Sequence, residues 1–288
     1  MTSVRRRQPW IAVFVLVTVV PIVAGLVFMA TYASGGIGLL SHGWTDAYWL
    51  RVLGDARTWS SLGYSFAVGL VSLLVSILVA LGALAALGPW AMRRPLSSLW
   101  FVPLTAPPLV AAIISVEMFG NAGWLARVAH ALGWIQSPVD FPDVLFTASG
   151  LGIIVTHVAL VAPFLVLLFG RLERHLRLDA LARVAHTLGA SRMQVWTRVR
   201  IPALLRTAEP TLTVYGLVLV GAFEIPLLVG AQSPSMISVL IERQFAHFDI
   251  TTKPEAYALA TLYALIAMSL LLAWFGWRGT RRMQGHGA

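Results

Sequence analysis

Six long apolar runs constrain this chain more than any other feature of its sequence. Each holds about 20 or more residues with few charges, and a helix rising about 1.5 Å per residue crosses a hydrocarbon core of about 30 Å in that length. An open sheet would leave backbone N–H and C=O groups unpaired in lipid, so we expect helices. The expected spans are roughly 10–32, 60–88, 97–119, 145–170, 210–230 and 256–277.

The composition agrees with a single membrane-embedded domain over residues 1–288. The chain is 58% hydrophobic and 11% charged, whereas soluble domains carry about 25% charged residues. It contains no cysteine, which excludes disulfides and thiolate-ligated zinc or iron–sulfur sites. Arg5, Arg6 and Arg7 precede the first run as in a signal peptide, but the run exceeds the usual apolar core of about 7–15 residues. We expect it to be retained as the first helix.

The basic residues gather in alternate loops. Of the 21 lysines and arginines, 16 precede the first span, follow the last, or lie between spans two and three or spans four and five. Such residues mark the cytoplasmic side of a membrane protein. Both termini are therefore expected in the cytoplasm. The formal charge of +9 then reflects topology, and no nucleic-acid partner is expected.

The cytoplasmic loop 171–209 has the most ordered pattern outside the spans. Apolar residues recur at helical spacing from Leu181 to Leu188, and Asp179 suits the positive end of that helix. Gly189 is expected to end it, because glycine readily takes a positive φ angle. The pattern predicts a short amphipathic helix and a tight turn.

A second short helix is expected after this turn. Ser191 begins it, and Gln194 stands three residues later, the spacing of a capping box. Pro202 is expected to stop it, because proline disrupts a helix interior. On pattern alone, two interpretations stay open. The loop is either a lever that a soluble partner grips, or a solvated basic segment that only sets topology.

The same loop resembles a known family. Permease subunits of binding-protein-dependent ABC importers with the MetI-like fold carry the pattern Glu-Ala-Ala, three residues, Gly, nine residues, Ile-x-Leu-Pro. Here the register reads Arg183-Val184-Ala185, three residues, Gly189, nine residues and Val199-Arg200-Ile201-Pro202. The loop also lies between spans four and five of six, as in that family. The chain is identified as resembling such permeases over roughly residues 60–277.

The resemblance implies an all-α, six-helix permease in a bacterial inner membrane. It implies a second permease subunit, identical or paralogous, two ATP-binding subunits and an external solute-binding protein. ATP and Mg would bind the ATPase subunits, because this chain has no Walker-type phosphate loop. We expect the chain to be no enzyme and to hold no cofactor or metal of its own.

The resemblance also assigns residues to ATPase docking. The family's Glu is replaced by Arg183, which puts in question any ion pair that the Glu makes and points to a partner with matching acidic residues. The expected docking residues are Arg183, Ala185, Gly189, Ala190, Ser191, Met193, Val195, Trp196 and Pro202.

Few residues bear on the substrate. Glu224 is expected in the outer half of span five and Glu117 near the outer end of span three, and ionisable groups at membrane depth tend to face a polar interior. Two carboxylates there would suit a cationic solute such as a polyamine, although either could lie at headgroup level or pair with a polar neighbour. His157, near the middle of span four, either lines the pathway or bonds to a neighbouring helix.

Three alternatives stay open. The strings FVPLTAPPLVAAI and GAFEIPLLVG resemble permeases of the polyamine and inorganic-ion type, and sugar-importer permeases are the nearest alternative. A secondary transporter would need no ATPase and would show inverted repeats with charges at the midplane. A membrane enzyme would need catalytic side chains that converge inside the membrane.

Glycines that we expect to allow close helix packing are Gly63, Gly69, Gly82, Gly150 and Gly152.

Overall fold

The computed structural model describes residues 8–38, 41 and 43–284. All regular structure in these residues is helical, which confirms the expected all-α class. Arg5, Arg6 and Arg7 lie outside the described residues. The chain forms two compact units. We call Ser61–Val239 the bundle unit, and Met1–Ser60 with Leu240–Ala288 the flanking unit.

Six segments of the described chain are long and apolar enough to cross a membrane, as the sequence predicted. The fifth begins before its expected start because helix runs on from Arg192, and the third extends past residue 119 because a separate short helix, Trp124–Ala131, follows it. The six segments are Val13–Ala33, Ala56–Met92, Pro108–Ala131, Leu151–His175, Arg192–Val220 and Ile250–Arg278.

The bundle unit is organised around three long helices, α3 (Ala56–Leu87), α7 (Leu151–His175) and α10 (Ile201–Val220). Their fully buried side chains include Leu84, Phe169 and Leu204, which belong to one hydrophobic cluster. Its other elements are η1 (Gly88–Met92), α4 (Leu96–Leu99), η2 (Pro103–Thr105), α5 (Pro108–Phe119), α6 (Trp124–Ala131), η3 (Pro138–Asp140), α8 (Leu178–Thr187), α9 (Arg192–Val195), the π-helical turn η4 (Trp196–Arg200), α11 (Glu224–Val229) and the start of α12 (Ile237–Ala246).

Prolines divide two of the expected spans. The helix expected over 210–230 ends with α10 at Val220, and α11 begins at Glu224. Pro226 lacks an N–H to donate within a continuous helix, whereas in the first turn of a new helix that N–H is not needed. In the same way the expected span 97–119 becomes α4, η2 and α5, and both η2 and α5 carry proline in their first turn.

Of the glycines on α3 that were expected to allow close packing, Gly69 does so inside the bundle unit. A Cβ atom at Gly69 would lie 2.8 Å from Val220 Cγ2 and 2.9 Å from the Val220 backbone nitrogen. Gly63 and Gly82 on the same helix have open space around this position. A Cβ at Gly150 would lie 2.8 Å from the Tyr64 hydroxyl, and one at Gly152 would lie 2.9 Å from Leu145 Cδ2. The expectation of close packing is therefore confirmed at Gly69, Gly150 and Gly152, and within this chain it is wrong at Gly63 and Gly82.

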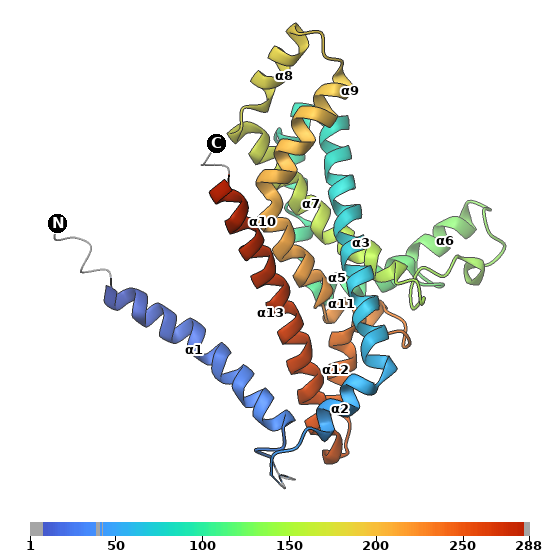
Figure 1. Ribbon diagram of the computed structural model, residues 1–288. Helices are drawn as coiled ribbons and strands as arrows, with labels where there is room; N and C mark the ends of the chain where they lie inside the picture. Colours follow the sequence, from blue (N-terminus) through green and yellow to red (C-terminus); the bar gives the residue numbers. More distant parts are fainter. Residues whose placement is uncertain (1–7, 39–40, 42, 285–288) are drawn as a thin grey trace. The chain divides into compact units, whose positions relative to one another are not determined.

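The flanking unit joins α1 (Gln8–Ala33), α2 (Ala47–Gly54), η5 (Ile250–Thr252) and α13 (Lys253–Gln284), with one end each of α3 and α12. Aromatic rings of Tyr32 and Tyr257 lie 4.3 Å apart between their centroids and pack α1 against α13. Arg51 of α2 forms an ion pair with Glu255 of α13 at 3.1 Å. These contacts hold α2 and α13 together (Figure 1).

Candidate functional site

The segment from α8 to η4 lies at one end of the bundle unit, beyond the ends of α7 and α10 (Figure 1). Arg177, with a positive φ of 49°, turns the chain out of α7 and into α8. Leu178, only 1% exposed, anchors the start of α8 in the hydrophobic cluster. We call residues Leu178–Arg200 the docking segment.

Helix α8 turns its apolar stripe outward. Leu181, Val184 and Leu188 are 51%, 58% and 82% exposed, while Ala182 on the other side of the helix is 5% exposed. This confirms the helix that the spacing predicted, and Asp179 lies in its first turn. An exposed apolar helix face at a polar end of the unit is a surface suited to a protein partner.

The turn after α8 has the geometry that its residues predicted. Gly189 takes a φ angle of +86°, and the Ala190 N–H donates to the Ala185 carbonyl at 3.0 Å. The Ser191 N–H donates to the Gln194 side chain at 2.8 Å, and the Gln194 N–H donates to Ser191 Oγ at 3.3 Å. The capping box is confirmed, so the turn is closed by local bonds.

Pro202 does not stop the second helix, which corrects the sequence prediction. Helix continues from Arg192 through η4 and α10 to Val220, a run of 29 residues. In the π-helical turn, the Ile201 N–H donates to the carbonyl of Trp196, five residues earlier. The wider turn relieves the clash that a proline ring makes with the carbonyl four residues before it. The docking segment is thus continuous with a membrane span.

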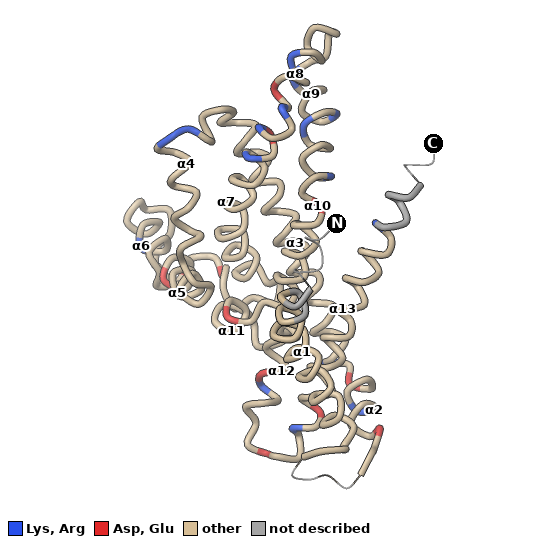
Figure 2. Tube along the Cα trace, turned by 90° about the vertical axis from the view of Figure 1, so that its left-hand side faces the viewer, with Lys and Arg blue, Asp and Glu red and all other residues tan. Residues whose placement is uncertain are grey.

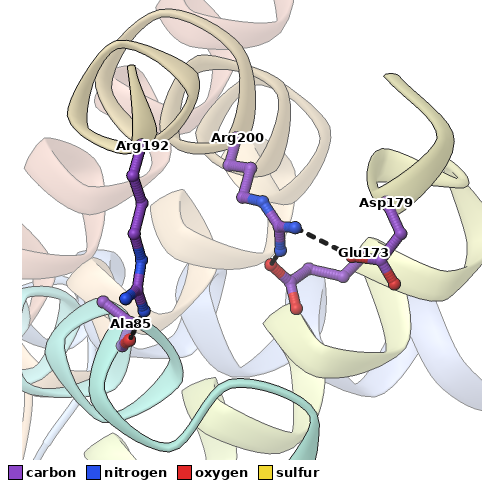
Figure 3. A network of polar contacts seen from close by, with 5 residues as sticks. All are labelled: Ala85, Glu173, Asp179, Arg192 and Arg200. Atoms are coloured by element: carbon purple, nitrogen blue, oxygen red, sulfur yellow. Dashed lines mark hydrogen bonds and ion pairs between the residues drawn. The ribbon is translucent and has the colours of Figure 1, made fainter. Parts of the chain in front are cut away.

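Arg200 binds two carboxylates and fixes the docking segment to α7 (Figure 3). It donates to Glu173 Oε1 and to Asp179 Oδ1, both at 2.8 Å. Its guanidinium also lies 5.2 Å from the centre of the Trp196 ring. The Arg200 and Glu173 side chains are each 18% exposed and the Asp179 side chain 69%. One side chain therefore joins the ends of α7, α8 and η4.

Arg192 makes a second connection, to α3. Its guanidinium donates to the main-chain oxygen of Ala85 at 3.3 Å (Figure 3). The docking segment is thus held against two spans, through Arg200 to α7 and through Arg192 to α3. The sequence places Arg200 in the motif register but does not identify Glu173 and Asp179 as its partners, because bonds between distant residues leave no local pattern. For the same reason it gives Arg192 no role.

The predicted docking residues differ in their accessibility. Met193 is 73% exposed, whereas Val195 is 2% exposed. Arg183 and Ser191 are exposed, and Trp196 is half-buried beneath Arg200. Val195 thus supports the turn from inside, and a partner would reach the exposed members of the set. The remaining members, Ala185, Gly189, Ala190 and Pro202, lie at the α8–α9 turn or at the start of α10, and their docking role stays a prediction.

The three pathway candidates lie in different settings. Glu117, on α5, and Glu224, at the start of α11, are both exposed, and these two helices pack against each other. His157 on α7 is 2% exposed, and its Nδ1 lies 3.3 Å from Ser72 Oγ on α3. The structure thus favours an interhelical bond for His157, and it leaves both glutamates accessible.

No protein-family model matches the chain. The spermidine/putrescine transport system permease protein PotB of Salmonella typhimurium is 27% identical over 275 residues, which cover 90% of this chain and 91% of PotB. The molybdenum transport system permease protein ModB of Mycobacterium tuberculosis is 28% identical over 185 residues, 64% of this chain and 65% of ModB.

The crystal structure of a bacterial ABC transporter that imports the acidic polysaccharide alginate contains a similar chain. It superposes with a TM-score of 0.69 over 97% of both chains, at 16% identity. The chain is thus similar in sequence to transport-system permease proteins and shares the fold of a chain in an ABC importer. In this chain the docking segment precedes and continues into the fifth candidate span, Arg192–Val220. A related structure, in complex with an alginate-bound periplasmic protein, superposes at 0.63 over 93% of both chains at 17% identity.

Proposed function

We propose that this permease moves a small solute into the cytoplasm and that its docking segment binds a separate ATPase subunit. The observation that carries the proposal is an exposed apolar stripe, Leu181, Val184 and Leu188, on a helix that is fixed to its own bundle. A flexible loop would absorb a push from a partner. A helix fixed through Arg200 and Arg192 transmits it to α7 and α3.

The continuous helix from Arg192 to Val220 supports the same mechanism. A force on Met193 at its exposed beginning acts directly on a segment long and apolar enough to span the membrane. The permease is then a two-state element whose equilibrium the partner biases. ATP and Mg belong in this proposal to the ATPase subunits, and a second permease and a solute-binding protein complete the transporter.

The charges of the bundle unit support a cytoplasmic position for the docking segment. Figure 2 shows most of its basic positions at the end that carries α8 and α9, and acidic positions on α5 and α11. Basic residues mark the cytoplasmic side. We therefore place this segment in the cytoplasm, with Glu117 and Glu224 toward the outside. Four candidate spans precede it and two follow it, which would put both termini in the cytoplasm as well.

For the solute, we propose a small cation of the polyamine type. Two accessible carboxylates, Glu117 and Glu224, lie on helices that pack together, and negative charge attracts a cation by simple electrostatics. The relative PotB is named for spermidine and putrescine, which supports this choice. Relatives named for molybdenum and alginate keep an anionic or sugar-like solute as the alternative.

The absence of cysteine makes the topology directly testable. Thr187→Cys and Val139→Cys place single thiols on exposed positions of α8 and η3. In intact cells a membrane-impermeant maleimide should label Val139→Cys only, and after lysis it should label both. Labelling of Thr187→Cys in intact cells would place the docking segment outside the cytoplasm and would reject its proposed role in binding the ATPase.

Function is tested by uptake and by subunit association. Cells that lack the gene should lose uptake of labelled putrescine or spermidine, and the gene should restore it. The full chain, purified in mild detergent, should carry an ATP-hydrolysing subunit. Restored uptake of a different solute would reject the cation and keep the ABC importer. Uptake that persists without any ATPase subunit would reject the mechanism.

A further inference from the structure

A cleft of about 430 Å³ opens beside the docking segment. Its lining comes from α3, η1, α7, α8, α9 and η4, all within the bundle unit. We call it the basic cleft, because Arg93, Arg174, Arg192 and Arg200 line it together with two carboxylates, Glu173 and Asp179. Cavities of about 300–1,000 Å³ are typical of small-molecule sites.

The two carboxylates of the cleft are already engaged by one arginine. Arg200 bonds both Glu173 and Asp179 at 2.8 Å. Among the described residues, the other three arginines form no ion pair. Arg93 lies 4.7 Å from the centre of the Trp90 ring, and Arg192 bonds a main-chain oxygen. Positive charge therefore remains uncompensated in the cleft.

The three remaining cations belong to different elements. Arg93 follows η1, Arg174 lies in the last turn of α7, and Arg192 begins α9. Guanidinium groups bind phosphate and carboxylate oxygens through two parallel N–H donors, and several of them around one cavity match the many oxygens of a phosphate group. A cationic or neutral ligand would leave the charges unmatched.

The position of the cleft indicates where a phosphate group could come from. Arg93 comes directly after the candidate span Ala56–Met92, and Arg174 lies at the end of Leu151–His175. The ends of membrane spans lie at the level of the lipid headgroups, and basic pockets between helices on the cytoplasmic side bind anionic headgroups. We propose that the basic cleft binds a phosphate group, carried by an anionic phospholipid of the inner leaflet or by free phosphate.

A bound phosphate group would connect parts of the cleft that Arg200 does not join. It would lie among Arg93, Arg174 and Arg192, and so link the ends of α3 and α7 to the start of α9. The docking segment would then be held by an ionic contact that depends on the surrounding membrane. This proposal rests on the cytoplasmic position proposed above for the docking segment, but it does not depend on ATPase docking.

The test measures ligand binding to the full chain purified in detergent. Phosphatidylglycerol, phosphatidylcholine and inorganic phosphate are added separately, and bound ligand is counted by native mass spectrometry and by the shift in Tm, since a ligand that binds the folded state raises Tm. Phosphatidylglycerol should bind and raise Tm more than phosphatidylcholine, and added salt should weaken binding. A response to inorganic phosphate alone would identify free phosphate as the source.

Matched variants separate the cleft from general basic charge. Arg93→Gln with Arg174→Gln should weaken binding roughly tenfold or more, as expected for the loss of charge-assisted hydrogen bonds. Arg94→Gln with Arg171→Gln removes two neighbouring charges that do not line the cleft, and it should leave affinity within about twofold, the ordinary spread for exposed charges. Arg174→Lys keeps the charge but loses the fork geometry of the guanidinium, so it should lower phosphate affinity to an intermediate degree. This variant keeps the proposal testable if the double variant fails to fold. Equal losses in both double variants, or no binding of either phosphate source to the unaltered chain, would overturn the proposal.

Discussion

Arg200 and Glu173, 27 residues apart in the sequence, form an ion pair with 2.8 Å between Nη1 and Oε1. The pair joins the π-helical turn to the end of α7 at a place where both side chains are mostly shielded from water. Asp179 extends the contact to α8. A single guanidinium therefore sets the position of the docking segment relative to two neighbouring helices.

Removing this ion pair should impair transport more than ATPase association. Arg200→Gln leaves Glu173 partly buried without its cation, a change expected to cost about 1–3 kcal/mol. We expect the ATPase to remain bound and uptake per ATP hydrolysed to fall several-fold. Uptake and ATPase rates of the reconstituted transporter measure the effect.

A double-mutant cycle with Glu173→Gln isolates the pair. The two substitutions should be strongly non-additive, because the second removes an interaction already lost. Arg198→Gln, an exposed arginine of the same turn, serves as the matched control and should leave coupling unchanged. Additive effects of Arg200→Gln and Glu173→Gln would contradict a shared role.

Gly189 should be sensitive to substitution through backbone strain alone. Its φ angle is +86°, and a Cβ atom there would meet no atom within 4 Å. Gly189→Val should therefore strain the turn by about 1–2 kcal/mol and weaken ATPase retention in detergent, with Gly189→Asn tolerated better. Gly82→Ala, a helical position that also has open space, is the control and should be neutral or stabilising. If Gly189→Val retained the ATPase as well as the unaltered chain does, the turn would not be part of the docking site.

Val184 should be part of the surface that the ATPase covers. A charge at this exposed position of the apolar stripe would be desolvated on docking, which costs several kcal/mol. Val184→Glu should therefore abolish copurification of the ATPase while the chain stays monodisperse in size-exclusion chromatography. Val139→Glu makes the same change at a valine that is 73% exposed on η3, and it should retain the ATPase. Loss in both variants would point to a general defect in folding.

Glu224 should contribute to affinity for a cationic solute. Glu224→Gln removes one negative charge from the start of α11, and we expect the KM for polyamine uptake to rise about three- to tenfold, typical for one partly screened charge pair. Glu242→Gln on α12 is the control for loss of an acidic residue. Unchanged KM and unchanged solute preference in Glu224→Gln would reject a substrate role for this residue.

Much of the docking segment was predictable because its determinants are local. The positive φ of Gly189 and the capping box of Ser191 and Gln194 depend on residues within three positions of each other. The helix from Leu178 to Thr187 follows from periodicity. Pro202 misled the prediction because the π-helical turn before it takes up the proline, and a local rule for proline assumes an ordinary α-helix.

By itself the sequence determined that the chain is all-α with six candidate spans, because the partition of 20-residue apolar runs out of water depends on composition and length alone. Only the tertiary structure decided that Gly69 is needed for packing and Gly82 is not, and that Arg200 binds Glu173 and Asp179. It also decided that Glu224 begins a new helix. These features arise where residues far apart in the chain meet in space, and their contact energies are absent from any single stretch of sequence.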